Sequence, residues 1–231
     1  MLPIIILSGG LATRLRPLTF ETPKALIPIL GRPFIDWQLE QMRRQGFRKV
    51  IISTGYLGSL IQDHVGDGHE YDLEVTYSHD GGSPLGTGGA VYKASRLVKG
   101  KFLVTYGDSY LPVSFREFSK VFETSKFESF MAVYKNENQL DSSNIIFEAG
   151  KIISYSKLKT SHAYNYIDYG LLGFDGSIFD DLKMDMPWDL SNLLSRLADT
   201  GQIGAYLADE RFYEIGSFNG IADLENYLKE K

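Results

Sequence analysis

The sequence contains no cysteine among its 231 residues, and this absence removes several classes of chemistry at once. Disulfide bonds, thiolate nucleophiles and cysteine-ligated metal sites are all excluded. The four histidines show no spacing typical of metal ligands. Any catalytic or metal site must therefore be built without cysteine.

Long apolar runs and an excess of positive charge are also missing. No stretch approaches the ~20 apolar residues of a membrane span. The apolar residues 1–7 are too few for a secretory signal and follow no basic segment. The net charge of −5 argues against nucleic-acid binding by bulk electrostatics. We therefore expect a cytoplasmic location, with neither a membrane nor a nucleic acid as partner. The sequence does not indicate an oligomeric state.

Segments with strand and helix patterns alternate through residues 1–135. The strand patterns cover residues 4–7, 49–54, 73–78, 101–106 and 129–134, and the helix patterns cover residues 33–45, 57–65, 87–98 and 115–122. Such alternation is typical of βαβ units, whose crossovers are right-handed. We predict an α/β fold with a doubly wound, mostly parallel sheet.

The alternation ends at about residue 136. Residues 144–147 and 152–155 flank the sequence EAGK, which predicts a hairpin. A further strand is predicted at 166–174, with helices at 189–198 and 218–227. No repeat, linker or low-complexity segment interrupts the chain. We therefore predict one domain over residues 1–231, in which the C-terminal part adds an antiparallel elaboration to the sheet.

The first strand is followed by an unusually long, cationic loop, LSGGLATRLRPLTFETPK at residues 7–24. Loops after strands in α/β units usually have only a few residues, so a loop of this length indicates function. Gly9 and Gly10 permit a tight turn with N–H groups directed at an anion. Arg14 can bind phosphate oxygens bidentately, and Lys24 adds a point charge. The loop has neither the three-glycine dinucleotide pattern nor the G-K-[ST] of a P-loop.

Two other unusual segments follow predicted strands. Ligands of open α/β sheets bind beyond the carboxyl ends of the strands. The glycine-rich residues 81–89 can pack against a flat base, and Asp108 stands behind Gly107 at the end of the fourth strand. A carboxylate beside a polyphosphate needs a cation between them, and Mg²⁺ suits this arrangement. Glu214 is the second candidate ligand.

These segments together resemble a known family. Residues 9–19 (GGLATRLRPLT) with Pro23 and Lys24 closely resemble the G-G-x-G-T-R-L-x-P-L-T…P-K signature of the sugar-1-phosphate nucleotidylyltransferases. Four later segments are similar to family elements in the same order: PLGTGGA at 84–90, Gly107-Asp108, YSK at 155–157 and YIDYGL at 166–171. Within the family, the short chain resembles muramate-1-phosphate uridylyltransferases and heptose-1-phosphate guanylyltransferases.

The resemblance implies a Rossmann-like nucleotidyltransferase fold and a role in NDP-sugar biosynthesis for cell-surface polysaccharides. A sugar-1-phosphate would attack the α-phosphorus of a nucleoside triphosphate in line, with Mg²⁺ as cofactor and pyrophosphate as leaving group. Residues 1–135 would form the nucleotide-binding half and residues 136–231 the sugar-binding half. The implied roles are catalysis for Arg14 and Lys24, metal binding for Asp108 and Glu214, nucleotide binding for Leu7, Ser8, Gly9, Gly10, Thr13, Gly81, Pro84, Gly86 and Thr87, and sugar-phosphate binding for Lys157, Asp168 and Gly170.

Four residues depart from the family pattern: Ala12 and Ser156 replace a glycine and a glutamate, Glu214 replaces an aspartate, and Asp168 stands where asparagine is common. Ala12 indicates that its position does not need a positive φ. The substituted metal ligand keeps open an alternative, a non-catalytic nucleotide- or sugar-sensing subunit on the same fold. A nicotinamide-dependent oxidoreductase is disfavoured because the three-glycine spacing is missing. The base (guanine, uracil or cytosine) and the sugar stay open.

Overall fold

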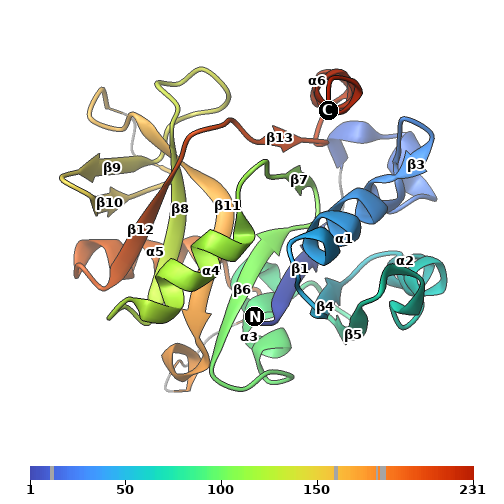
Figure 1. Ribbon diagram of the computed structural model, residues 1–231, viewed down its shortest axis with the longest axis horizontal. Helices are drawn as coiled ribbons and strands as arrows, with labels where there is room; N and C mark the ends of the chain where they lie inside the picture. Colours follow the sequence, from blue (N-terminus) through green and yellow to red (C-terminus); the bar gives the residue numbers. More distant parts are fainter. Residues whose placement is uncertain (11–12, 159–160, 181, 183–185) are drawn as a thin grey trace.

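The computed structural model describes residues 1–10, 13–158, 161–180, 182 and 186–231. Leu11 and Ala12, including the departure noted at Ala12, lie outside the described residues. The described chain forms a nine-stranded mixed sheet with helices on both faces (Figure 1). The predicted α/β class is confirmed.

The centre of the sheet is parallel and comes entirely from the first half of the chain. The order is β5 (Glu74–His79), β4 (Lys49–Thr54), β1 (Ile4–Ser8) and β6 (Lys101–Tyr106), with every neighbouring pair parallel. The apolar run at the start of β1 is fully buried on both sides. This is the pattern expected of a strand covered by helices on both faces.

Helices cover the two faces in an alternating way, because successive side chains of β1 point to opposite faces. Ile4 and Ile6 pack in one core cluster with α1 (Phe34–Arg44), α2 (Gly58–Val65) and α4 (Phe115–Thr124). Ile5 packs in a second cluster with α3 (Gly86–Ser95) and α5 (Leu190–Asp199). The predicted doubly wound arrangement therefore holds for this region.

The second half extends the sheet with mainly antiparallel strands. β11 (Tyr166–Asp175) runs antiparallel to β6 and to β8 (Ser129–Lys135). The predicted hairpin is present as β9 (Ile145–Glu148) and β10 (Lys151–Tyr155), with positive φ at both turn residues, Ala149 and Gly150. The sequence patterns did not predict β12 (Ile203–Ala208), which pairs parallel with β8.

The remaining elements of the described residues are 3₁₀ turns, short strands and the last helix. They are the 3₁₀ turns at Thr13–Leu15, Leu18–Phe20, Lys24–Leu26, His69–Tyr71 and Gly176–Phe179, the paired β2 (Pro28–Ile29) and β3 (Arg32–Pro33), the paired β7 (Ser109–Tyr110) and β13 (Tyr213–Glu214), and α6 (Phe218–Lys229). The β7–β13 pair ties the strand-end loop after β6 to the C-terminal part of the chain. It therefore joins the two halves at the edge where ligands are expected.

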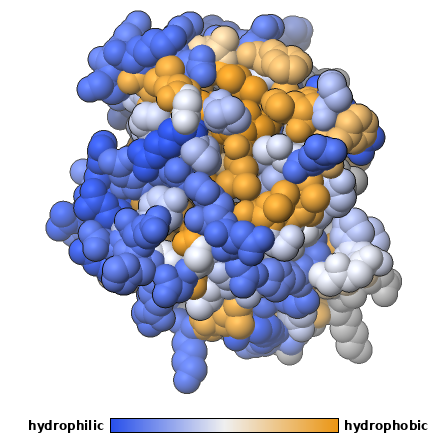
Figure 2. Space-filling view, turned by 90° about the vertical axis from the view of Figure 1, so that its right-hand side faces the viewer, coloured by the Kyte–Doolittle hydropathy of each residue, from blue (hydrophilic) through white to orange (hydrophobic). Residues whose placement is uncertain are grey.

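Hydrophobic and hydrophilic side chains both reach the surface of the side that carries α2 and β3 (Figure 2). Leu18, Phe20 and Leu30 are among the exposed apolar residues of the chain. None of the helices within the described ranges is long and apolar enough to cross a bilayer.

Candidate functional site

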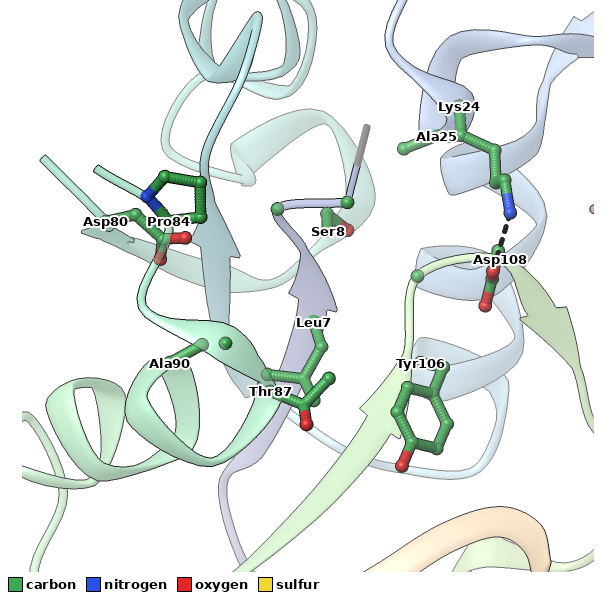
Figure 3. A pocket seen from close by; sticks show the side chains of 14 residues that line it. Leu7, Ser8, Lys24, Ala25, Asp80, Pro84, Thr87, Ala90, Tyr106 and Asp108 are labelled. Atoms are coloured by element: carbon green, nitrogen blue, oxygen red, sulfur yellow. Dashed lines mark hydrogen bonds and ion pairs between the residues drawn. The ribbon is translucent and has the colours of Figure 1, made fainter. Parts of the chain in front are cut away.

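A cavity of about 330 Å³ lies at the carboxyl ends of the parallel strands, lined by residues that end or follow β1, β5 and β6 (Figure 3). Gly9 follows β1, Gly55 follows β4, Asp80 follows β5 and Gly107 follows β6. Two of these loops touch closely: a Cβ at Gly55 would lie 2.7 Å from the carbonyl oxygen of Gly9. Only a glycine fits there without displacing the first loop.

The structure brings most of the sequence-predicted nucleotide residues to this cavity. Its wall includes Leu7, Ser8, Gly9, Gly10, Lys24, Pro84, Gly86, Thr87 and Asp108. Thr13, Arg14 and Gly81 are not among the lining residues, and all three are exposed. The positive charge of Arg14 nevertheless has a small influence at the site, because it opposes the rise in the pKa of the Glu214 carboxyl.

Two glycines of the glycine-rich residues 81–89 pack against another part of the chain, which is a role independent of any ligand. The N–H groups of Gly88 and Gly89 donate to the carbonyl oxygen of Trp188, at 2.9 and 3.3 Å. A Cβ at Gly88 would lie 2.1 Å from the Trp188 ring. The Thr87 hydroxyl accepts a hydrogen bond from the Leu190 N–H at 2.9 Å. Part of this glycine pattern is therefore explained by a segment about 100 residues later in the chain.

Lys24 and Asp108 form an ion pair at the rim of the cavity. Lys24 Nζ lies 2.7 Å from Asp108 Oδ2, as Figure 3 shows. The lysine begins a 3₁₀ turn at the far end of the first loop, and the aspartate follows β6. Their side chains are 20% and 36% exposed, so both groups can still be reached by a ligand.

The β7–β13 pair brings Glu214 beside Asp108. Glu214 is the register partner of Ser109, and the Ile215 N–H donates to the Asp108 carbonyl at 2.9 Å. Burial of the carboxyl group, together with the negative charge of Asp108, raises the pKa of Glu214 to about 7, and the charge of Lys24 opposes this rise. Although Glu214 is exposed as a whole residue, its carboxyl group is crowded by the loop around it.

This donor set fits Mg²⁺. The ion prefers oxygen ligands and takes one or two protein carboxylates together with phosphate oxygens. Across the part of the chain that the structure describes, no group of three or more histidine, cysteine, aspartate or glutamate residues is arranged to hold a metal. Asp108 and Glu214 would therefore share the ion with a phosphate-bearing ligand.

A second cavity, of about 480 Å³, adjoins the first and shares Tyr106 and Asp108 with it. Its wall includes Lys157, Asp168, Gly170 and Glu214, so the structure brings the predicted sugar-phosphate residues together. Lys157 Nζ lies 3.3 Å from Asp189 Oδ1, in a pair whose side chains are about half exposed. The ammonium group is thus held loosely, where a phosphate can compete for it.

Asp168 is oriented by an irregularity in β11. The register with β8 shifts between Asp168 and Leu172, and Gly170 has a φ of 85°. The Asp168 carboxylate accepts the Gly170 N–H at 2.9 Å, and the Asp168 N–H donates to Asn144 Oδ1 at 2.9 Å. Burial raises the pKa of Asp168 to about 6, which the Gly170 N–H and the charge of Lys157 oppose. The bulge therefore directs a poorly solvated carboxylate into the cavity.

Several residues that line the cavities are not among the predicted site residues, including Asp80, Tyr106 and Asn144. Asp80 carried a detectable signal, because it follows a predicted strand and precedes the glycines. Its Oδ2 lies 3.5 Å from the Leu85 N–H, whereas its buried Oδ1 has no hydrogen-bond partner within the described residues. Burial is the main cause of the raised pKa of Asp80.

Comparisons with known proteins agree with this geometry. The chain is 36% identical to an N-acetylmuramate alpha-1-phosphate uridylyltransferase of Neisseria meningitidis over 122 residues, which is 52% of each protein. It is 27% identical to a D-glycero-alpha-D-manno-heptose 1-phosphate guanylyltransferase of Campylobacter jejuni, over 92% of this chain and 93% of that protein. The crystal structure of HddC from Yersinia pseudotuberculosis matches with a TM-score of 0.84 and 24% identity, over 99% of this chain and 100% of that one.

The alignment with the Neisseria protein thus spans about half the length of that relative. The family model of nucleotidyl transferases matches residues 4–230. This match covers both cavities and every strand of the sheet. The chain belongs to the nucleotidyl transferase family.

Proposed function

We propose that the protein transfers a nucleoside monophosphate from a nucleoside triphosphate to a sugar-1-phosphate, forming an NDP-sugar and pyrophosphate. The observation that carries this proposal is the pair of cavities that meet at Tyr106 and Asp108. One cavity is built at the ends of parallel strands, where nucleotides bind in open α/β sheets. The other suits a polar second substrate, and Lys24 lies at the junction.

The first cavity would hold the triphosphate. Its phosphates would lie against the backbone of Gly9 and Gly10, with Arg14 approaching from the adjoining turn. Lys24 would turn from Asp108 to the α-phosphate and stabilise the charge that develops there. Positioned charges of this kind supply most of the catalysis in phosphoryl transfer.

The second cavity would hold the sugar-1-phosphate. Lys157 would bind its phosphate, while Asp168 and Asn144 would accept or donate hydrogen bonds to sugar hydroxyls. The attacking phosphate oxygen is already ionised near neutral pH, so no general base is needed. Asp108 and Glu214 would hold Mg²⁺, which when bound neutralises charge on the phosphates.

The first cavity favours guanine as the base. Asp80 places a carboxylate in its wall, with Oδ1 lacking a partner within the described residues. Guanine offers two adjacent donors, N1–H and the N2 amino group, that match the two oxygens of a carboxylate. Uracil and cytosine place an acceptor next to each donor, which a carboxylate repels. The relatives do not decide the base, because the Neisseria protein is a uridylyltransferase and the Campylobacter protein is a guanylyltransferase.

A matrix of triphosphates against sugar-1-phosphates, measured by pyrophosphate release, tests the reaction. We expect turnover that requires both substrates and Mg²⁺. Binding of nucleotide without pyrophosphate release, with every pair, would contradict the proposal and support the sensing subunit instead.

The variant Asp80→Asn tests the base. Loss of a bidentate contact costs about 1–3 kcal/mol, so we expect kcat/KM with GTP to fall about 10- to 100-fold and the preference over UTP to narrow. Asp63→Asn, on the exposed side of α2, is the matched control. A wild-type preference for UTP or CTP, or an unchanged preference in Asp80→Asn, would overturn the assignment of guanine.

A further inference from the structure

Gln38 lies on α1 and lines neither of the two cavities, yet it holds the loop that carries Asp108. Its side chain is almost fully buried, at 2% exposure. Nε2 donates to the carbonyl oxygens of Tyr106 at 2.9 Å and Ser109 at 2.8 Å. These two carbonyls flank Gly107 and Asp108, so a single amide group bridges the two ends of the turn that contains Asp108.

Other hydrogen bonds also fix the turn, and the Ser109 hydroxyl donates to Asp108 Oδ1 at 3.3 Å. The Gly107 N–H donates to the Leu7 carbonyl at 2.9 Å, which ties the turn to β1. The Ile215 N–H donates to the Asp108 carbonyl at 2.9 Å, which ties it to the segment that carries Glu214. Gln38 adds two more hydrogen bonds, and these connect residues on both sides of Gly107 and Asp108. Asp108 is therefore oriented by β1, β13 and α1 together.

The donors of Gln38 explain why this residue type stands here. Both N–H groups of the amide are used, whereas the buried Oε1 has no hydrogen-bond partner within the described residues. An unpaired buried acceptor destabilises a fold. A purely apolar side chain would avoid this loss of stability. The presence of glutamine is therefore better explained by its hydrogen bonds to the two carbonyls than by packing alone.

Two further glutamines, one on α1 and one at its C-cap, provide an internal comparison. Gln41 Nε2 donates to the Leu111 carbonyl at 2.7 Å, and Gln45 Nε2 donates to the Val113 carbonyl at 3.2 Å. With Gln38 they follow the helical spacing i, i+3 and i+7. The same helix face thus holds residues 106–113 at several points, and Gln38 is the member adjacent to Asp108.

We propose that Gln38 is a positioning residue that fixes the direction of the Asp108 carboxylate toward Lys24 and the metal. The inference rests on the proposed function, in which Asp108 is a metal ligand. Groups that orient a metal ligand without touching the metal typically change metal affinity or activity 10- to 100-fold when they are removed. Small displacements of a reacting group have similar effects on turnover.

The test compares Gln38→Met with Gln41→Met. Methionine keeps the length and bulk of glutamine but has no donors, so each variant deletes the hydrogen bonds to the 106–113 segment at one place. Binding of Mn²⁺ in the presence of GTP, followed by electron paramagnetic resonance without sugar phosphate, reports the metal site independently of turnover. Pyrophosphate release against Mg²⁺ concentration and the melting temperature complete the measurements.

We expect Gln38→Met to weaken Mn²⁺ binding and to lower kcat at least tenfold, with an unchanged KM for the sugar phosphate. Gln41→Met should lose a similar amount of thermal stability but change metal binding less than twofold. Equal metal binding in the two variants would overturn the proposal. Gln38→Glu, which keeps the shape, is the second variant; if neither Gln38 variant folds, the residue serves the fold alone and the proposal is wrong. Failure of the proposed function would instead appear as a wild-type protein that releases no pyrophosphate.

Discussion

The two cavities of this protein are built in different ways, although they share Tyr106 and Asp108. The first is walled largely by backbone and small residues at the ends of parallel strands, such as Gly9, Gly10 and Gly107. The second is walled by polar side chains on antiparallel strands and their connections, such as Asn144 and Asp168. Backbone groups suit phosphates, which every nucleotide carries. Side chains suit the part of a substrate that differs from one family member to another.

The difference also extends to charge. The first cavity combines Lys24 with the carboxylates of Asp80 and Asp108. The second has Lys157 as a cation, facing carboxylates that include Asp141, Asp168 and Glu214. Lys24 lies at the boundary, where the reaction would occur. Changing it should therefore affect turnover more than any change within one cavity.

Lys24→Ala should have the largest effect. Removing a charge positioned at the reacting phosphate should lower kcat about 10²- to 10³-fold. The fold should persist, because a partly exposed ion pair contributes little to stability. Pyrophosphate release and the melting temperature measure the two effects. Lys49→Ala, which removes the exposed Lys49–Glu74 pair, is the control; activity near wild type in Lys24→Ala would refute its role.

The same contrast explains what could be predicted from the sequence. β4 and β6 begin and end where the sequence patterns place them, because a continuous apolar run in a βαβ context specifies a buried parallel strand. The first cavity was predicted from glycines and cations that lie close together in the chain. Local backbone chemistry leaves a local signature.

The second cavity and the connections between the halves left weaker signals. β12 lacks a clear alternation and is stabilised by pairing with β8, about 70 residues earlier. The Trp188 segment and Gln38 act through contacts with residues far away in the chain. Tyr106 is the last residue of a predicted strand, and nothing in the local sequence indicates that it lies between two cavities. Such roles depend on tertiary packing, which the spacing of residues in one sequence does not specify.

Gly88→Ala tests how far the nucleotide cavity depends on the second half of the chain. The new Cβ would lie 2.1 Å from the Trp188 ring, so the ring must move. We expect the free energy of unfolding to fall by about 1–3 kcal/mol, as for other overpacked sites, even though alanine is the better helix former. KM for the triphosphate should rise as well.

Gly82→Ala is the matched control, because a Cβ at Gly82 meets nothing within 4 Å. Both positions belong to the same glycine-rich stretch, so a general effect of glycine replacement would appear in both variants. Equal stability of the two variants in chemical denaturation would show that the Trp188 segment adapts freely. The cavity wall would then be independent of the second half.

Asp168→Asn should have the smallest effect, and its sign depends on pH. Folding raises the pKa of Asp168 to about 6, whereas an unfolded aspartate titrates near 3.9. Between these values the native state binds more protons than the unfolded state, so ionisation of Asp168 lowers stability as pH rises. Asparagine cannot ionise but can still accept the Gly170 N–H. A pKa difference of about 2 corresponds to about 3 kcal/mol, and solvent screening reduces this because Asp168 is partly exposed. The variant should therefore gain about 1–2 kcal/mol over wild type at pH 8 and almost nothing at pH 4.

Thermal unfolding without ligands, measured from pH 4 to pH 8, checks this dependence, with Asp63→Asn as an exposed control. A difference between Asp168→Asn and wild type that stays constant with pH would mean that the carboxylate is solvated in the native state. A difference in stability that grows with pH and levels off above about pH 7 would mean that the ionised Asp168 carboxylate destabilises the native wild-type protein. Because Asp168 is held by Gly170 and faces the proposed sugar site, such a charge is best explained by the hydrogen bonds it accepts from a bound substrate. The same variant should then bind the sugar phosphate more weakly while being the more stable protein, which separates recognition from stability within this cavity.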